Sequence, residues 1–116
     1  MSHTLLDEYA RLLTTDTRAC ANLFASDAEF STHVGSHRLT FKGREDIGRF
    51  LRHVPCQIAF RAAHCVADAG GFSGSLRLSA ADLRPRQQRV RYFVEGGRIT
   101  RFEVLHGHLA PESRAS

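Results

Sequence analysis

The spacing of apolar residues differs between the two halves of this chain of 116 residues, and that difference constrains the fold most. Up to about residue 54, apart from a short alternating stretch at 28–41, apolar residues recur every three or four positions, which is typical of amphipathic helices. From Cys56 onward they alternate with polar residues, which is typical of strands that bury one face. Helices followed by a run of strands predict an α+β domain, with the helices packed on one face of an antiparallel sheet.

The first two predicted helices lie before residue 25. One spans roughly residues 3–14, and its apolar stripe is formed by Leu5, Leu6, Tyr9, Leu12 and Leu13. The second is short and begins after Asp16, whose carboxylate can accept hydrogen bonds from the free backbone N–H groups of the first turn. Both helices expose one polar face, so both are expected to cover the sheet.

A small hairpin and a third helix are predicted next. Residues 28–41 alternate around a Gly-Ser turn, which indicates two short strands. The stretch KGREDIGRFLRHVP (42–55) then opens at Gly43, carries acidic residues in its first turn and ends at Pro55. The third helix is therefore expected to cover the sheet, and the hairpin to frame the edge of a cavity.

Four long strands are predicted to complete the chain: 56–68, 72–80, 88–94 and 98–106. Gly70-Gly71 and the sequence EGG supply tight turns, and residues 82–87 interrupt the alternation. A sheet curled around three helices makes a cone with a cavity at its open end. Residues 1–110 are expected to form this single domain, and 111–116 a polar tail.

Composition excludes several classes of protein. The hydrophobic fraction of 42% and eight Phe can fill a core. The net charge of +4 invites a nucleic-acid interpretation, but arginines are spread along the chain with acids between them, so nucleic-acid binding is not expected. No apolar run is long enough to span a membrane, and the N-terminal residues are expected to form a helix of the mature protein rather than a signal peptide. Three Cys without a CxxC pattern indicate free thiols in the cytoplasm, and no ligand spacing for a metal is found.

Three short stretches, LFASDAEF, KGREDIGRFL and VEGGRITRFEVL, together resemble the SnoaL-like group of proteins. This group belongs to the superfamily of nuclear transport factor two, steroid Δ-isomerase and limonene-epoxide hydrolase. The resemblance covers about residues 4–106 and implies a cystatin-like cone. The fold hosts isomerases, cyclases, dehydratases, hydrolases and non-catalytic domains, so it does not fix an activity.

The comparison with steroid isomerases is mixed. Tyr9 falls where that family has the tyrosine of its oxyanion hole, Thr32 where it has its general-base aspartate, and Arg89 where it has a protonated aspartate. Threonine is no base near neutral pH, and arginine is no neutral acid, so the isomerase mechanism is not supported. The Asp–Arg–Asp set of the epoxide hydrolases also lacks its aspartates here.

The facing of the third long strand has two interpretations. Arg89 and Arg91 share one face, and Val90 and Tyr92 share the other. The pattern alone favours the arginines in solvent and Val90 and Tyr92 inside. The alternative is that the arginines enter the pocket and bind a carboxylate or enolate.

The resemblance implies that the pocket face carries Phe102, Val104 and His106, together with Arg89 and Arg91. We adopt this facing as the prediction, with Thr32 as a further pocket residue. The opposite face commonly packs a second subunit in this superfamily. An exposed apolar set there then predicts a homodimer: Val90, Tyr92, Val94 and Leu105.

Two functions are compatible with these residues. One is a small enzyme, without metal or organic cofactor, that isomerises or cyclises an apolar carbonyl or acidic compound. His106 or His33 would act as base, while Tyr9 and Arg89 would stabilise negative charge. The alternative is a non-catalytic module of the same fold that binds a small molecule or dimerises. The sequence alone does not decide whether the chain is an enzyme.

Overall fold

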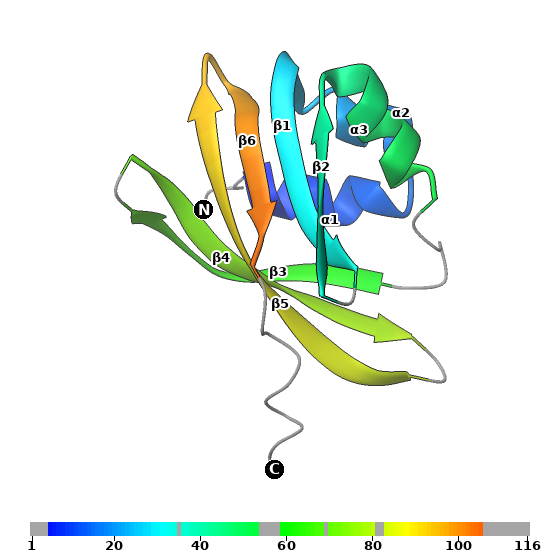
Figure 1. Cartoon of the computed structure of the whole chain (residues 1–116). Helices are drawn as coiled ribbons and strands as arrows, with labels where there is room; N and C mark the ends of the chain where they lie inside the picture. The colour runs from blue at the N-terminus through cyan, green and yellow to red at the C-terminus, as the bar shows by residue number, and fades with distance from the viewer. Residues whose placement is uncertain (1–4, 35, 54–58, 69, 81–82, 106–116) are drawn as a thin grey trace.

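The computed structural model of the chain describes residues 5–34, 36–53, 59–68, 70–80 and 83–105. Three helices and six strands occur in these ranges: α1 (Leu5–Leu13), α2 (Thr17–Ala21), β1 (Phe24–Val34), β2 (His37–Lys42), α3 (Arg44–Leu51), β3 (Ala59–Asp68), β4 (Gly71–Ala80), β5 (Leu83–Glu95) and β6 (Arg98–Val104). Predictions for Pro55, Cys56, His106 and the tail lie outside them. The predicted α+β architecture, with a curved sheet around N-terminal helices, is confirmed (Figure 1).

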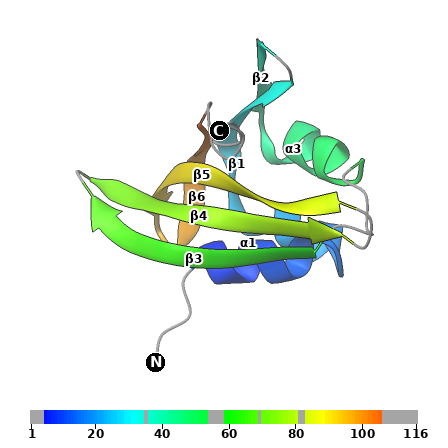
Figure 2. The ribbon, with the colours of Figure 1, turned by 90° about the horizontal axis from the view of Figure 1, so that it is seen from below.

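The strands form one sheet in the order β2-β1-β6-β5-β4-β3. All neighbours are antiparallel except β1 and β6, which run parallel. The last strand therefore lies between the small hairpin and the long meander, and joins the two halves of the chain. Figure 2 shows β3, β4 and β5 as long strands that run across α1, so the sheet bends around the helices.

The local signals at the helices are confirmed. The carboxylate of Asp16 caps α2, since its Oδ1 accepts a hydrogen bond of 3.1 Å from the backbone N–H of Ala19. Glu45 and Asp46 occupy the first turn of α3. The buried face of α1 consists of Leu6, Tyr9, Ala10 and Leu13, which places its stripe against the sheet.

Two strands begin earlier than the sequence predicts. β1 starts at Phe24 rather than near residue 28, because the backbone there is bonded to the last strand: the N–H of Ile99 donates to the carbonyl of Leu23 at 2.8 Å. β5 starts at Leu83, and the residues around Pro85 do not end it. The pairing of β4 with β5 shifts register near this point, and such irregularities tolerate a proline.

An aromatic row crosses the concave face of the sheet. One ring from each of five adjacent strands contributes to it: Phe41, Phe30, Phe102, Tyr92 and Phe72. The successive ring centroids are 6.5, 5.2, 6.0 and 5.2 Å apart. Tyr9 of α1 lies on this row, 4.6 Å from Phe102. The space between α1 and the centre of the sheet is therefore filled by packed rings.

Candidate functional site

One step from the aromatic row, the concave face is lined by smaller side chains. Val104 lies opposite Val90, and Thr32 follows Ser31, which lies opposite Glu103, so the register continues to these three residues; we call Thr32, Val104 and Val90 the mouth row. Thr32 and Val104 retain 8% and 6% exposure, whereas Phe102 has none. The mouth row lies near the ends of β1 and β6, one step along these strands from the aromatic row.

The long strands continue the concave face beyond the mouth row. Phe60 pairs with Leu78, and Ala62 with Leu76, which places these apolar residues on the same face. Phe60, Ala62 and Leu78 are half-buried, and Gln88 lies opposite Leu76. We call this surface the concave wing: Phe60, Ala62, Leu76, Leu78 and Gln88. It presents partly exposed apolar area with one amide in it.

Tyr9 belongs to the core. Its side chain is 3% exposed and its ring packs against Phe24 and Phe102. Burial, with a smaller contribution from Cys20, raises the pKa of Tyr9 well above its ordinary value of 10.0. Near neutral pH its hydroxyl is therefore protonated and can act as a hydrogen-bond donor, but not as a base.

The adopted facing of Arg89 and Arg91 is wrong. Val90 lies opposite Val104 and Tyr92 opposite Phe102, and both residues are 1% exposed. Successive side chains of a strand point to opposite faces, so Arg89 and Arg91 lie on the outer face, away from the helices. Burial of the apolar pair decided the facing, because placing two guanidinium groups inside instead would be costly.

The same finding removes the basis given for a homodimer. Val90 and Tyr92 are in the core, so the exposed apolar set expected on the convex face is not formed. His33 also lies on the outer face, since Thr32 and Phe30 face inward on β1 and His33 alternates with them. Among the described candidates, the concave face therefore brings together Tyr9, Thr32, Phe102 and Val104.

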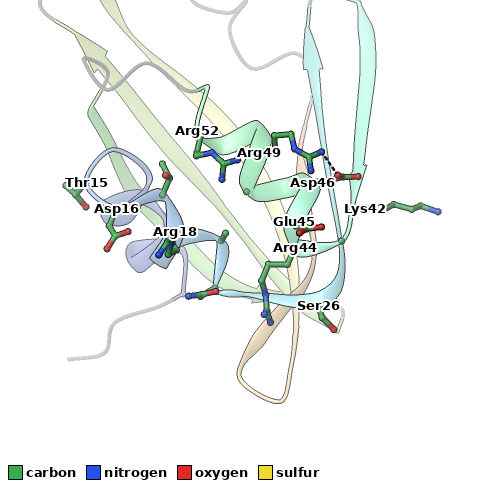
Figure 3. Close-up of a pocket in the computed structure, with 15 residues that line it drawn as sticks. Thr15, Asp16, Arg18, Ser26, Lys42, Arg44, Glu45, Asp46, Arg49 and Arg52 are labelled. Carbon is green, nitrogen blue, oxygen red and sulfur yellow. Dashed lines mark hydrogen bonds and ion pairs between the residues drawn. The ribbon is translucent and has the colours of Figure 1, made fainter.

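A hollow lined by described residues lies elsewhere, between α2 and α3 (Figure 3). Its volume is about 1060 Å³. We call it the α2–α3 groove; its lining includes Asp16, Arg18, Ala21, Asn22, Ser26, Lys42, Arg44, Glu45, Asp46, Gly48, Arg49 and Arg52. The sequence prediction missed it. The signal was Gly48, because glycine inside a helix usually has a packing reason.

That packing reason is visible at the bottom of the groove. A Cβ on Gly48 would lie 3.3 Å from the Cβ of Ala21, so the two helices approach closely at small residues. Long polar side chains rise on either side of this contact. The two walls come from separate helices, which is why linear spacing did not reveal them.

Within the described ranges, no group of three or more His, Cys, Asp or Glu side chains is placed to hold a metal ion. In the same ranges, each helix is too short or too polar to cross a membrane.

Solved structures with a similar fold include enzyme-like proteins. A candidate ketosteroid isomerase from Kribbella flavida matches with a TM-score of 0.71 and 24% identity, over 86% of this chain and 73% of that one. A candidate polyketide cyclase from Sinorhizobium meliloti matches with a TM-score of 0.72 and 19% identity, over 87% and 93%. A protein of ketosteroid isomerase-like fold from Catenulispora acidiphila, in complex with trimethylamine, gives 0.75 and 16%, over 92% and 88%.

These likenesses establish the fold and confirm the resemblance found in the sequence. A search among curated proteins finds no match to this chain. The model of the nuclear transport factor 2 (NTF2) domain family matches residues 1–100. The chain therefore belongs to the NTF2 domain family.

Proposed function

We propose that this domain binds an apolar small molecule on its concave face, between the mouth row and the concave wing. The observation that carries the proposal is the aromatic row, which fills the base of the cone and leaves apolar, partly exposed surface beyond it. A ligand there would rest on Val104 and Val90 and cover Leu78 and Phe60.

The chemistry of these walls defines the ligand class. The side chains of the mouth row and the concave wing are aliphatic or aromatic apart from Thr32 and Gln88, which can hydrogen-bond a carbonyl or hydroxyl group. The exposed Arg86 lies opposite Leu78 at the far end of the same face. Covering about 150 Å² of apolar ligand surface would contribute roughly 4 kcal/mol at about 25 cal/mol per Å². Arg89 and Arg91 lie on the other face, so this site carries no preference for acidic ligands from them.

Cofactor-free catalysis is the second candidate. It is favoured by the isomerase- and cyclase-like proteins that share the fold. With His33 outside, the base would be His106, which the alternation of Phe102 and Val104 predicts for the same face. Tyr9 would serve as the donor. Enolisation of a bound ketone would then require His106 to remove a proton next to the carbonyl group.

Binding is tested with the uncharged fluorophore N-phenyl-1-naphthylamine and with androstenedione as a competitor. Leu78→Asp should weaken binding at least tenfold, because it places a charge on the apolar wing. Ser79→Asp is the matched control, since Ser79 is the next residue along β4 and its exposed side chain lies on the outer face. Equal affinities of the two variants, at equal folded fractions, would contradict the proposed site.

Catalysis is tested by deuterium exchange from D₂O into the positions beside the carbonyl group of bound androstenedione. If the chain is an enzyme, deuterium exchange should be faster with the protein than in buffer alone. His106→Ala should remove this acceleration without weakening ligand binding. Binding without such exchange would leave the chain as a binding module.

A homodimer through the outer face is also proposed, on a different basis from the one given above. A hollow of about 400 Å³ there is lined by Val66, Ser73, Ser75, Gln87, Arg89 and Leu105, among others. Val66 is 59% exposed, and a second copy would cover it. Sedimentation at micromolar concentration should show a dimer that Val66→Glu dissociates; a monomeric wild type contradicts this proposal.

The free thiols of Cys20 and Cys65 support a cytoplasmic location.

A further inference from the structure

The α2–α3 groove is lined by more basic than acidic side chains. Five basic and three acidic side chains line it: Arg18, Lys42, Arg44, Arg49 and Arg52, and Asp16, Glu45 and Asp46. Some of these side chains are already engaged by partners within the protein. A basic group that has no acidic partner is available to an anionic ligand.

Two basic residues are engaged in ion pairs. Arg49 Nη1 lies 2.9 Å from Asp46 Oδ1, and Figure 3 shows this pair at the side of α3. Lys42 Nζ lies 3.7 Å from Glu29, and the figure shows the lysine directed away from the groove. Neither side chain is therefore among the groups that the groove offers to a ligand.

Three guanidinium groups remain. Arg18 and Arg52 are exposed, and within the described part of the chain neither forms an ion pair. Arg44 is half-buried, and its Nε donates to the carbonyl of Phe24 at 3.0 Å. That bond fixes the side chain at the entrance of α3 and leaves its two terminal nitrogens for other acceptors.

The acids do not balance these three groups. Asp46 is paired with Arg49, and Asp16 accepts from Ala19 as the cap of α2. The cap bond leaves the charge of Asp16 in place, so Asp16 and Glu45 are two carboxylates without an ion pair among the described residues, against three arginines. The polar lining also supplies the amide of Asn22 and the hydroxyl of Ser26.

We propose that the α2–α3 groove is a binding site for a small molecule that bears phosphate groups. The arginines come from α2, the start of α3 and the end of α3, so they approach from different directions. A phosphate offers three terminal oxygens and up to two negative charges, which suits several donors at once. A carboxylate offers two oxygens in one plane, which a single arginine can satisfy.

The length of α3 indicates more than one phosphate. Arg44 begins this helix and Arg52 caps it, which separates their backbones by about 12 Å at 1.5 Å per residue. One phosphate group would engage chiefly one end of the groove. A chain of two or three phosphates would engage both ends, and so would bind more tightly.

The experiment titrates the ¹⁵N-labelled full chain with phosphate, pyrophosphate and tripolyphosphate at constant ionic strength set by potassium chloride. We expect saturable shifts of groove amides such as those of Thr17, Ser26 and Gly48, with affinity rising along the series. Arg18→Gln and Arg52→Gln should each weaken tripolyphosphate binding about tenfold or more, as expected for a lost charge-assisted hydrogen bond. Arg18→Lys should restore part of the loss.

Arg11→Gln is the matched control, because Arg11 is an exposed arginine on α1 that pairs with Glu8 outside the groove. Equal weakening by Arg11→Gln, or saturation absent for every phosphate, would overturn the site. Succinate binding as tightly as pyrophosphate would overturn the phosphate assignment, and tighter binding of a dT₈ oligonucleotide through the same arginines would overturn the small-molecule one. Fluorophore binding at the concave face should be unchanged in all three glutamine variants.

Discussion

Replacing Phe102 by alanine should remove the centre of the aromatic row and cost about 3–5 kcal/mol of unfolding free energy. Phe102 is fully buried, and its ring centroid lies 4.6, 5.2, 6.0 and 6.1 Å from those of Tyr9, Phe30, Tyr92 and Phe24. Four ring contacts are lost together with the buried area, which places the expected cost toward the upper end of the range. Rings on strands and on α1 cannot all move inward, so a cavity should remain.

The size of the effect allows the variant to stay folded. A domain of 116 residues has a stability of roughly 6–17 kcal/mol at about 0.05–0.15 kcal/mol per residue. At about 4 °C per kcal/mol, the midpoint of thermal unfolding should fall by roughly 12–20 °C. Urea unfolding followed by far-ultraviolet circular dichroism is the appropriate assay, since the chain contains no Trp.

Phe93→Ala provides the matched comparison. Phe93 lies on the outer face, half-buried, with the guanidinium carbons of Arg91 and Arg101 at 5.4 and 6.0 Å from its ring centroid. Its removal should cost about 1 kcal/mol, the scale of exposed cation–π contacts with limited burial. Equal losses of unfolding free energy for Phe93→Ala and Phe102→Ala would refute the view that the aromatic row is the centre of the core.

The remaining predictions concern local features. Asp16→Ala should lower the unfolding free energy by about 1 kcal/mol through loss of the α2 cap, measured in urea; an unchanged midpoint would show that the cap does not matter. Gly97→Ala should cost about 1 kcal/mol, because φ is +80° at the β5–β6 turn, and a neutral or stabilised variant would contradict this. Burial, and next the carboxylate of Asp16, raises the pKa of Cys20 from 9.0 to about 12. The folded state keeps this proton longer than the unfolded state, so the Cys20 contribution to stability is constant below about pH 9 and falls between about pH 9 and 12. Cys20→Ala should lack that part of the decline, and alkylation of native Cys20 at pH 8 should require unfolding.

The architecture was predictable because the two periodicities are local. Leu6, Tyr9 and Leu13 define a buried helix face through their spacing alone, and the Asp16 cap depends on residues three positions apart. These features need no knowledge of distant neighbours. The order of helices and strands then restricts the possible layers to very few.

The site was less predictable because it depends on register between strands. Val90 and Tyr92 alternate with arginines, and that pattern alone indicates arginines on the outside, whereas the resemblance implies the opposite facing. The structure shows that burial of the apolar pair decides the facing. The aromatic row was not predicted for the same reason, since its members lie far apart in the sequence and only strand pairing aligns them.

The parallel pairing of β1 with β6 has a consequence for synthesis on the ribosome. Phe30 pairs with Phe102, so the edge of β1 stays uncovered until β6, the last described strand, has been synthesised. Until β6 leaves the exit tunnel, the β1–β2 hairpin and the β3–β5 meander are separate pieces that expose unpaired edges and apolar rings. Closure of the sheet should then be the slow, late step of folding, because it joins segments distant in the chain. A nascent chain stalled before Arg98 should be the form that chaperones hold and proteases remove.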